Sequence, residues 1–275
     1  MTITRFAPSP TGYLHRGHAF SALSAYDLAT RQGGSFILRL EDIDQTRCRP
    51  QYEAAIYQDL AWLGLTWSQP VRRQSEHMAD YRAALANLAE RGLVYRCFRT
   101  RKEVAAEIEH APHDGPDAYI GTPLTPSVEA RRLANGDPYC WRLSLSAALE
   151  NLAKTSALTF VETTIGHVTL DPDLIGDVIL GRKDVGVAYH LAVTLDDALQ
   201  GITHIVRGQD LFEATHVHRL LQALLALPTP LYHHHRLLID ETGQRLAKRN
   251  GSETLQSLRD RGLSPHALRQ ELGFD

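Results

Sequence analysis

The fold is decided by residues 3–44, which read ITRFAPSPTGYLHRGHAFSALSAYDLATRQGGSFILRLEDID. A β-prone run over 3–7 predicts a short strand, because the proline-rich loop at 8–12 would suit neither a helix nor a central strand. Apolar residues recur at helical spacing from Gly17, and Gly33-Gly34 ends that helix before a second strand over 35–40. Two parallel strands joined by a helix place the first loop at the carboxyl edge of the sheet, where open α/β sheets bind ligands.

The rest of the chain continues this alternation with one interruption. Helical spacing recurs at about 51–64 and 78–92, and a strong helix that includes Leu211 stops before Pro228. Residues 96–140 mix arginines with prolines, which predicts an inserted, loop-rich subdomain. Strand-like runs lie at 157–161, 178–180, 190–194 and 202–206. We therefore expect an α/β fold: a parallel-sheet domain, an insert, and a small helical module at the C-terminal end.

Composition narrows the class of protein. The 275 residues are 43% hydrophobic and 22% charged, as in an ordinary globular protein rather than a disordered one. The net charge is −3, from 29 basic and 32 acidic residues, so a nucleic-acid partner would need a local basic face. No apolar run approaches the ~20 residues of a membrane span, and three cysteines are a sparse, odd set typical of a reducing compartment. We expect a cytoplasmic protein that does not bind membranes.

The loop after the first strand carries two histidines, in the tetrapeptide His15-Arg16-Gly17-His18. At a helix N-terminus, backbone and imidazole N–H groups favour a phosphate, and Gly17 lets it approach. Two alternatives stay open on this pattern alone. One histidine caps the turn while the other lies on the surface, or the pair binds a metal ion, although no acidic residue has the matching spacing.

A second basic motif lies near the C-terminal end, where Arg245, Lys248 and Arg249 stand between Gly243 and Gly251. Three cations in a flexible loop suit a polyphosphate leaving group, whose charge builds in the transition state. Alone, such a loop is more often a solvated surface. Together, the two motifs resemble the signature pair of class I aminoacyl-tRNA synthetases, an early His-x-Gly-His and a late loop similar to Lys-Met-Ser-Lys-Ser.

Four further segments resemble the glutamyl branch of that family. They are RFAPSPTG at 5–12, RLEDID at 39–44, AYHLA at 188–192 and VRGQDL at 206–211, and the resemblance extends from residue 1 to about 252. Full glutamyl-tRNA synthetases carry a long anticodon-binding region after their basic loop, and this chain ends soon after its own. The resemblance therefore points to the truncated glutamyl-Q tRNA(Asp) synthetase family, without an anticodon-binding domain.

This resemblance implies an organisation and an activity. Residues 1–95 and 186–228 would form the Rossmann-like catalytic domain, residues 96–185 an inserted acceptor or connective subdomain, and residues 229–275 a stem-contact-like helical module that carries the basic loop. The family uses ATP with Mg²⁺ to convert L-glutamate to glutamyl-adenylate, which is transferred to the queuosine base in the anticodon of tRNA(Asp). A monomer is expected. Two alternatives are a glutamate-adenylating ligase with a different acceptor and a non-catalytic RNA-binding relative.

The resemblance also implies roles for individual residues. His15, Gly17, His18 and Lys248 would bind ATP, and His15, His18 and Lys248 would be catalytic by positioning and charge stabilisation, without a protein nucleophile. The residues that would frame the glutamate are Arg5, Phe6, Ala7, Pro8, Ser9, Glu41, Tyr189 and Arg207.

The chemistry of glutamate fits this set. Arg5 or Arg207 can pair with the side-chain carboxylate, and Glu41 can accept hydrogen bonds from the ammonium group. Without the surrounding motifs, Arg207 would be interpreted as an ion pair with Asp210, and Tyr189 as core packing with its hydroxyl bonded to the backbone.

One departure concerns a zinc site that the family often has in the insert, formed by Cys-x-Cys, a tyrosine and a cysteine four residues later. Here only Cys97 and Tyr119 match, because Arg99 and Pro123 stand at the other two positions. One thiolate and one phenol do not complete a tetrahedral zinc site, so we expect zinc to be absent. His110 and His113 lie nearby in the sequence and are the alternative ligands, at an unfamiliar spacing.

Overall fold

The computed structural model describes residues 1–109, 119–153, 157–239 and 253–274. The first strand, helix and strand confirm the sequence prediction: β1 (Ile3–Phe6), α1 (Arg16–Arg31) and β2 (Ser35–Leu40). β1 and β2 pair in parallel, with Ile3 beside Ser35 and Phe6 beside Leu38. α1 packs on these strands through small side chains that are at most 1% exposed, namely Ala19, Ala22, Ala25 and Ala29. Small residues on this face let the helix lie close to the sheet.

The parallel sheet extends on both sides of this unit. β3 (Ser68–Arg73) pairs in parallel with β2. On the other side of β1 lies β9 (His204–Gly208), joined to it where the Ile3 carbonyl accepts from the Thr203 N–H at 3.0 Å. β10 (Leu231–His235) is parallel to β9 and to β6 (Thr159–Glu162), and β7 (Gly166–Thr169) is antiparallel to β6 at the edge.

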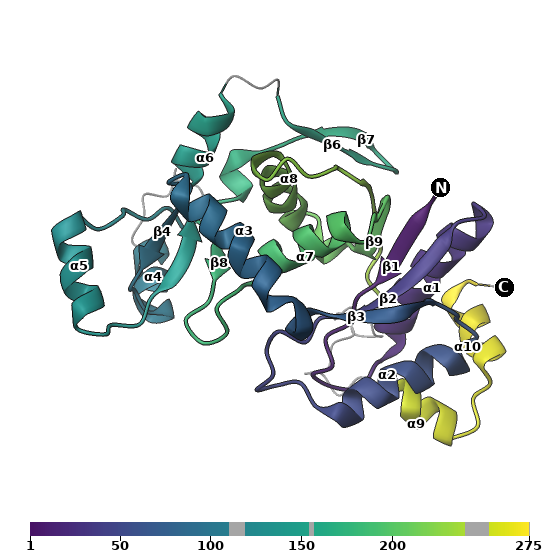
Figure 1. Ribbon diagram of the computed structural model, residues 1–275. Coiled ribbons are helices and arrows are strands. Elements are labelled where there is room, and N and C mark those ends of the chain that lie inside the picture. Colours follow the sequence, from purple (N-terminus) through teal and green to yellow (C-terminus); the bar gives the residue numbers. More distant parts are fainter. Residues whose placement is uncertain (110–118, 154–156, 240–252, 275) are drawn as a thin grey trace.

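The direction in which the sheet is built reverses between β1 and β9. From β1 the chain passes through α1 to β2, whereas from β9 it passes through α8 (Ala214–Leu224) to β10, on the opposite side. Such a reversal leaves a crevice at the carboxyl ends of the two central strands, where ligands bind in open α/β sheets. Figure 1 shows β1 and β9 side by side at the centre of the molecule.

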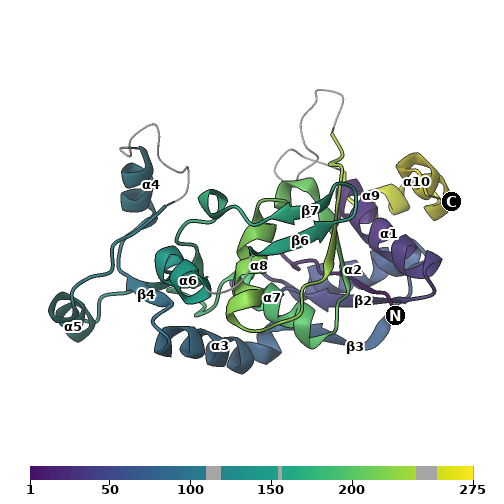
Figure 2. The ribbon, with the colours of Figure 1, turned by 90° about the horizontal axis from the view of Figure 1, so that it is seen from above.

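Helices cover the sheet and form two main hydrophobic cores. One core joins α1, the sheet and α2 (Pro50–Trp62) to the C-terminal helices α9 (Leu255–Asp260) and α10 (Pro265–Leu272). The other joins α3 (Met78–Glu90), α7 (Tyr189–Leu199) and α8. In Figure 2, α9 and α10 lie beside α1, far from the insert. In the described part of the chain, no helix is long and apolar enough to cross a membrane.

The insert has a small sheet of its own, in which β4 (Val94–Cys97) and β8 (Ile179–Gly181) flank β5 (Cys140–Leu143) in antiparallel order. Its helices are α4 (Arg101–Glu109), α5 (Pro126–Ala134) and α6 (Leu145–Leu152), and α4 and α5 form the end of the molecule opposite α10 (Figure 1). Short 3₁₀ helices occur at Gln74–His77, Pro172–Leu174 and Gln209–Leu211.

Strand pairing divides the chain differently from the predicted ranges. β6 and β7 fall inside the expected insert at 96–185 and β10 inside the expected helical module at 229–275, yet all three belong to the sheet that contains β9. The pairing of β6 with β10 joins residues about 70 positions apart, such as Glu162 and Tyr232, which a single sequence does not reveal. The strand expected at 190–194 is wrong, because these residues form α7; a short apolar run looks the same in a buried helix as in a strand.

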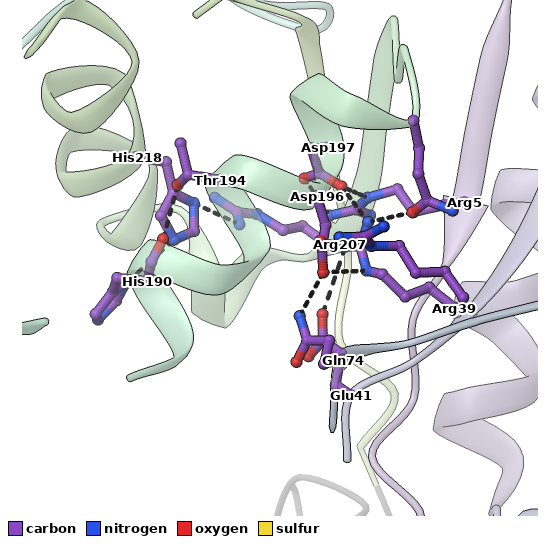
Figure 3. Close-up of polar contacts among 12 residues, drawn as sticks. Arg5, Arg39, Glu41, Gln74, His190, Thr194, Asp196, Asp197, Arg207 and His218 are labelled. Carbon is purple, nitrogen blue, oxygen red and sulfur yellow. Dashed lines mark hydrogen bonds and ion pairs between the residues drawn. The ribbon is translucent and has the colours of Figure 1, made fainter. Parts of the chain in front are cut away.

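A buried network of charges fastens α7 to the strands. Arg39 on β2 is fully buried, and its Nη1 donates to Asp197 Oδ1 at 2.8 Å. Arg5 on β1 pairs with the same carboxylate through Nε at 2.9 Å and Nη2 at 3.2 Å (Figure 3). Burial alone would raise the pKa of Asp197, but Arg5 and Arg39 hold this pKa below its ordinary value. The carboxylate therefore stays ionised in the interior.

The neighbouring Asp196 holds a second set of groups. It accepts from Arg72 Nε at 2.7 Å, Gln74 Nε2 at 2.9 Å and the Tyr81 hydroxyl at 2.8 Å. Asp196 and Tyr81 are both fully buried. These bonds connect α7 to β3 and α3, so that one side chain joins three elements of the fold.

We predict that Asp196→Ala destabilises the protein by about 3–5 kcal/mol, because it leaves the Arg72 guanidinium and the buried Gln74 and Tyr81 donors without their carboxylate. Asp27→Ala is the control, since Asp27 forms a surface ion pair with the exposed Arg31 on α1, and its loss should cost at most about 1 kcal/mol. Urea unfolding followed by circular dichroism measures both. Equal losses for the two variants would contradict the role assigned to Asp196.

Candidate active site

A cavity of about 620 Å³ opens at the carboxyl ends of β1 and β9. Its walls come from the loop after β1, the N-terminus of α1, the start of α7 and the segment after β10. Eleven of the twelve residues that the sequence analysis singled out for glutamate and ATP line this cavity: Arg5, Phe6, Ala7, Pro8, Ser9, His15, Gly17, His18, Glu41, Tyr189 and Arg207. The twelfth, Lys248, lies outside the described residues. The cavity therefore brings together segments more than 200 positions apart in the sequence.

The two histidines of the first loop have fixed tautomers at the N-terminus of α1. His15 Nδ1 accepts from the Gly17 N–H at 3.1 Å, and His18 Nδ1 accepts from the His15 N–H at 3.2 Å. A neutral imidazole that accepts at Nδ1 carries its hydrogen on Nε2. Both rings are thus donors at Nε2, beside the positive end of a 16-residue helix. This arrangement suits an anionic ligand such as a phosphate.

Gly17 is required by the packing of this cap. A Cβ at position 17 would lie 3.0 Å from His15 Cε1 and 3.1 Å from His15 Nδ1. A side chain there would require the His15 ring, whose Nδ1 accepts from the Gly17 N–H, to shift by a few tenths of an ångström. One of the alternatives left open by the sequence, a histidine that caps the turn, is therefore true of His15, and it is compatible with an anion site.

The segment that contains the late basic motif joins the rest of the protein at this cavity. Leu238, before it, lines the cavity, and Thr254, after it, forms an isolated β-bridge with His15. The Leu255 N–H also donates to the Leu14 carbonyl at 2.8 Å. Arg245, Lys248 and Arg249 themselves lie outside the described residues. Of the described residues on either side of these cations, Leu238 thus lies at the cavity and Thr254 at the N-terminus of α1.

The structure distinguishes the two arginines proposed for a carboxylate ligand. Arg5 is neutralised within the protein by its two bonds to Asp197. Arg207, on β9, is 5% exposed, and its hydrogen-bond partners in the described part of the chain are uncharged groups: Nε donates to His234 Nε2 at 3.1 Å, Nη1 to His218 Nδ1 at 3.1 Å and Nη2 to Thr215 Oγ1 at 2.7 Å.

Of these two arginines, Arg207 is therefore the one whose charge is available for a ligand. Among the described carboxylates none forms an ion pair with it, so the expected alternative of a pair with Asp210 is wrong. Three of the five N–H groups of a guanidinium are used by the bonds above, which leaves two. A buried positive charge without a carboxylate is costly for the protein alone and is relieved when a carboxylate ligand binds.

The charge of Glu41 is finely balanced. Burial raises the pKa of Glu41 to about 7, against the opposing effect of Arg39 and Arg5. Its Oε1 lies 3.5 Å from Arg39 Nη2, a weak contact that leaves the carboxylate able to bind another cation. Glu41 thus supplies an acceptor in the same cavity as the cation Arg207, as an amino acid with two oppositely charged ends requires.

Tyr189 does not pack in the core. At the start of α7 it lines the cavity and is 36% exposed, with its ring edge-on to His218 at 5.8 Å between centroids. The alternative of core packing is therefore wrong, and the side chain forms a wall of the cavity.

The sequence analysis missed the residues that hold these groups in place. They are Asp196, Asp197 and Arg39 on one side of the cavity and His190, His218, His234 and Glu162 on the other (Figure 3 shows all but the last two labelled). A signal existed for the first set, because Arg39 lies inside the apolar run of β2 and two consecutive aspartates lie inside the apolar α7. Charged residues in such positions indicate a buried network.

Cys97 and Tyr119, the two positions that match the family's zinc site, contact Cys140 and Arg142. Cys97 lies directly opposite Cys140 in the β4–β5 pair, and a hydrogen bond from the Cys140 thiol, with the nearby Arg142, lowers the pKa of Cys97. The Arg142 guanidinium also stacks on the Tyr119 ring at 4.3 Å. Within the described ranges no cluster of three or more His, Cys, Asp or Glu side chains could hold a metal ion, and His110 and His113 lie outside them. This donor set does not fit tetrahedral zinc.

Comparison with known proteins places this geometry in a family. Residues 1–274 match the family described as tRNA synthetases class I (E and Q), catalytic domain. The chain is 46% identical to a glutamyl-Q tRNA(Asp) synthetase of Rhodobacter capsulatus, over 99% of this chain and 100% of that one. It is 36% identical to a glutamate–tRNA ligase of Aquifex aeolicus, over 96% of this chain and 55% of the longer ligase.

Solved structures agree with this match. A glutamate tRNA ligase from Elizabethkingia meningosepticum, in complex with its amino acid, superposes with a TM-score of 0.79 at 25% identity. The glutamate-tRNA synthetase of Elizabethkingia anophelis superposes with a TM-score of 0.81 at 26% identity. In both, 98% of this chain is covered, and it spans only 60 and 61% of those longer chains. This protein belongs to the class I glutamyl- and glutaminyl-tRNA synthetase family, in which it groups with the glutamyl-Q tRNA(Asp) synthetases.

Proposed function

We propose that this protein activates L-glutamate with ATP to form glutamyl-adenylate, and then transfers the glutamate to the queuosine base in the anticodon of tRNA(Asp). The observation that carries the proposal is that one cavity is lined both by the buried Arg207, which has no carboxylate partner among the described residues, and by the His15 and His18 imidazoles at the N-terminus of α1. The choice of acceptor rests on the similarity, over its whole length, to the Rhodobacter protein of that name.

Glutamate fits the deeper part of the cavity. Its side-chain carboxylate binds the two remaining N–H groups of Arg207, and its ammonium group donates to Glu41. Tyr189 and the segment Arg5–Ser9 form the walls around it. Glutamine would present a neutral amide to Arg207 and leave the buried guanidinium without a counter-charge, so the enzyme prefers glutamate.

ATP fits the outer part, with its phosphates at the N-terminus of α1. The Nε2–H groups of His15 and His18 donate to phosphate oxygens, and the α-carboxylate of glutamate attacks the α-phosphorus in line with departing pyrophosphate. Lys248 neutralises the charge that builds on pyrophosphate. Mg²⁺ supplies further charge neutralisation on the phosphates when ATP binds. Catalysis then consists of positioning and electrostatic stabilisation.

In the second step a hydroxyl group of the queuosine base attacks the acyl carbon of glutamyl-adenylate, forms an ester and releases AMP. The enzyme acts as a monomer in the cytoplasm, where its tRNA is found. A ligase with another acceptor would share the first step and differ only in the second.

Two assays test the function. Glutamate-dependent exchange of labelled pyrophosphate into ATP reports the first step, and its absence would favour a non-catalytic RNA-binding protein. Transfer of labelled glutamate to tRNA(Asp) that contains queuosine, with tRNA(Asp) lacking queuosine as the matched control, reports the second. Exchange without transfer to either tRNA would favour a different acceptor.

The anion site gives a specific prediction. His18→Asn keeps an acceptor for the His15 N–H but loses the Nε2–H donor, so exchange should fall by about 10²-fold while the melting temperature stays within a few degrees. Lys248→Ala should cause a similar loss of exchange. His167→Asn, on the exposed strand β7, is the control and should leave the exchange rate unchanged. Near-normal exchange by His18→Asn would remove this residue from the ATP site.

Glu41 predicts a pH dependence. Since its pKa is about 7, the carboxylate is ionised above pH 7 and protonated below it, and only the ionised form attracts the ammonium group. The KM for glutamate should therefore rise about tenfold for each pH unit below 7. Glu41→Gln should have a high KM at every pH, with this slope removed. A slope retained in Glu41→Gln would assign the titration to another group.

Zinc content is a further test. The protein as purified should contain far less than one zinc per chain, and dialysis against a chelator followed by added Mg²⁺ should leave its activity unchanged, because Cys97 and Tyr119 offer two donors where four are needed. Elemental analysis measures the metal. One zinc per chain, lost together with activity in Cys97→Ser, would reinstate a metal site with other ligands.

A further inference from the structure

Two hydrogen-bonded histidines, the buried His218 and the half-buried His190, lie behind Arg207 and have no part in the mechanism above. His218, on α8, is 1% exposed and accepts from Arg207 Nη1 at its Nδ1, 3.1 Å away. Its other nitrogen, Nε2, lies 3.1 Å from Nδ1 of His190 on α7 (Figure 3). The three side chains form a chain of hydrogen bonds from the cavity wall through two helices.

The direction of every bond in this chain follows from Arg207. A guanidinium only donates, so His218 Nδ1 must be the acceptor. The neutral ring then carries its hydrogen on Nε2 and donates it to His190 Nδ1, which places the hydrogen of His190 on its own Nε2. On the opposite side, His234 Nε2 accepts from Arg207 Nε, and His234 Nδ1 donates to Glu162 Oε2 at 2.5 Å.

The surroundings keep these imidazoles uncharged. Burial, and then the charge of Arg207, lowers the pKa of His218 well below its ordinary value. The same two causes lower the pKa of His190 and of His234 to about 4. The groups that act on His218 come from four elements: Arg207 on β9, His190 on α7, Arg5 on β1 and His234 on β10. Arg207 thus keeps its charge among neutral acceptors.

The contrast with Arg5 shows what this arrangement achieves. Arg5 is held by a carboxylate, Asp197, which orients the guanidinium and also cancels its charge. His218 and His234 orient Arg207 equally directly, through two hydrogen bonds, without cancelling its charge. To recognise an anionic ligand, a buried arginine must be held in position while its positive charge stays available.

We propose that the His218–His190 pair positions Arg207 for the side-chain carboxylate of the substrate, so that His218 is a positioning residue for the choice of an acidic amino acid. This inference rests on the proposed function. It assigns to His218 a role in the KM for glutamate and in the preference for glutamate over glutamine, and no role in ATP binding.

Two substitutions of similar size separate orientation from charge. His218→Gln keeps one acceptor for Arg207 and one donor for His190 in an uncharged group, so the KM for glutamate should stay within about threefold. His218→Glu places a carboxylate against Arg207 and neutralises it, as Asp197 neutralises Arg5, so the KM for glutamate should rise about 100-fold or more. The KM for ATP should be unchanged in both.

The control for loss of a buried imidazole is His216 on the same helix. It is 2% exposed, accepts from the Asp171 N–H at 2.9 Å and makes no hydrogen bond to Arg207. His218→Leu and His216→Leu should lower the melting temperature alike, but only His218→Leu should raise the KM for glutamate, by about 10- to 100-fold. The proposal would be overturned if His218→Leu and His216→Leu had the same KM for glutamate. It would also be overturned if His218→Glu had the same KM for glutamate as His218→Gln.

A measurement that does not depend on catalysis tests the role of His218 separately from the proposed function. In ¹⁵N-histidine NMR of the wild-type protein, His218 should show an unprotonated Nδ1, a protonated Nε2 and no titration between pH 5 and 8. A protonated Nδ1, or titration in that range, would overturn the positioning role even if exchange is normal. If the wild type gave the expected NMR signals but no glutamate-dependent exchange, the proposed function would be refuted. The assignment of glutamate as the ligand of Arg207 would then be refuted as well.

Discussion

The site depends on two consecutive aspartates in one helix. Asp196 and Asp197 are buried on α7, and between them they bind three arginines, Arg5, Arg39 and Arg72, which come from three neighbouring strands. Buried charges are stable only when they are paired and fully hydrogen-bonded, so α7 and the strands are held in one relative position. That position decides where Tyr189, at the start of α7, meets the carboxyl ends of the strands.

The same pairing selects the arginine that faces the ligand. Arg5 lines the cavity but is neutralised by Asp197, whereas Arg207 is bonded to imidazoles and a hydroxyl group. Arg207 and Glu41 therefore line the cavity as a cation and an acceptor for a ligand. Together with the donors of His15 and His18 at the start of α1, they define where an acidic amino acid and a polyphosphate lie relative to each other.

Turn residues and apolar spacing predicted those elements whose boundaries are set by neighbouring residues in the sequence. The strand–helix–strand unit at 3–40 is correct because turn residues and apolar spacing mark its boundaries within a few positions. The grouping of the cavity residues followed from the resemblance of their motifs to the class I aminoacyl-tRNA synthetases. The partners of these residues did not follow, because Arg5 meets Asp197 across 192 positions and His234 meets Glu162 across 72. The short run at 190–194 was assigned to the wrong element because its periodicity does not distinguish a strand from a buried helix.

The most direct test of this account is the affinity for two amino acids that differ by one charge. Titration calorimetry of L-glutamate and L-glutamine with the wild-type protein and with Arg207→Leu measures it, with a non-hydrolysable ATP analogue present. The account predicts that the wild type binds glutamate about 100-fold more tightly than glutamine, and that Arg207→Leu loses this preference while it still binds the analogue. A preference for glutamate that persists in Arg207→Leu would contradict the claim that Arg207 is the cation that recognises the substrate.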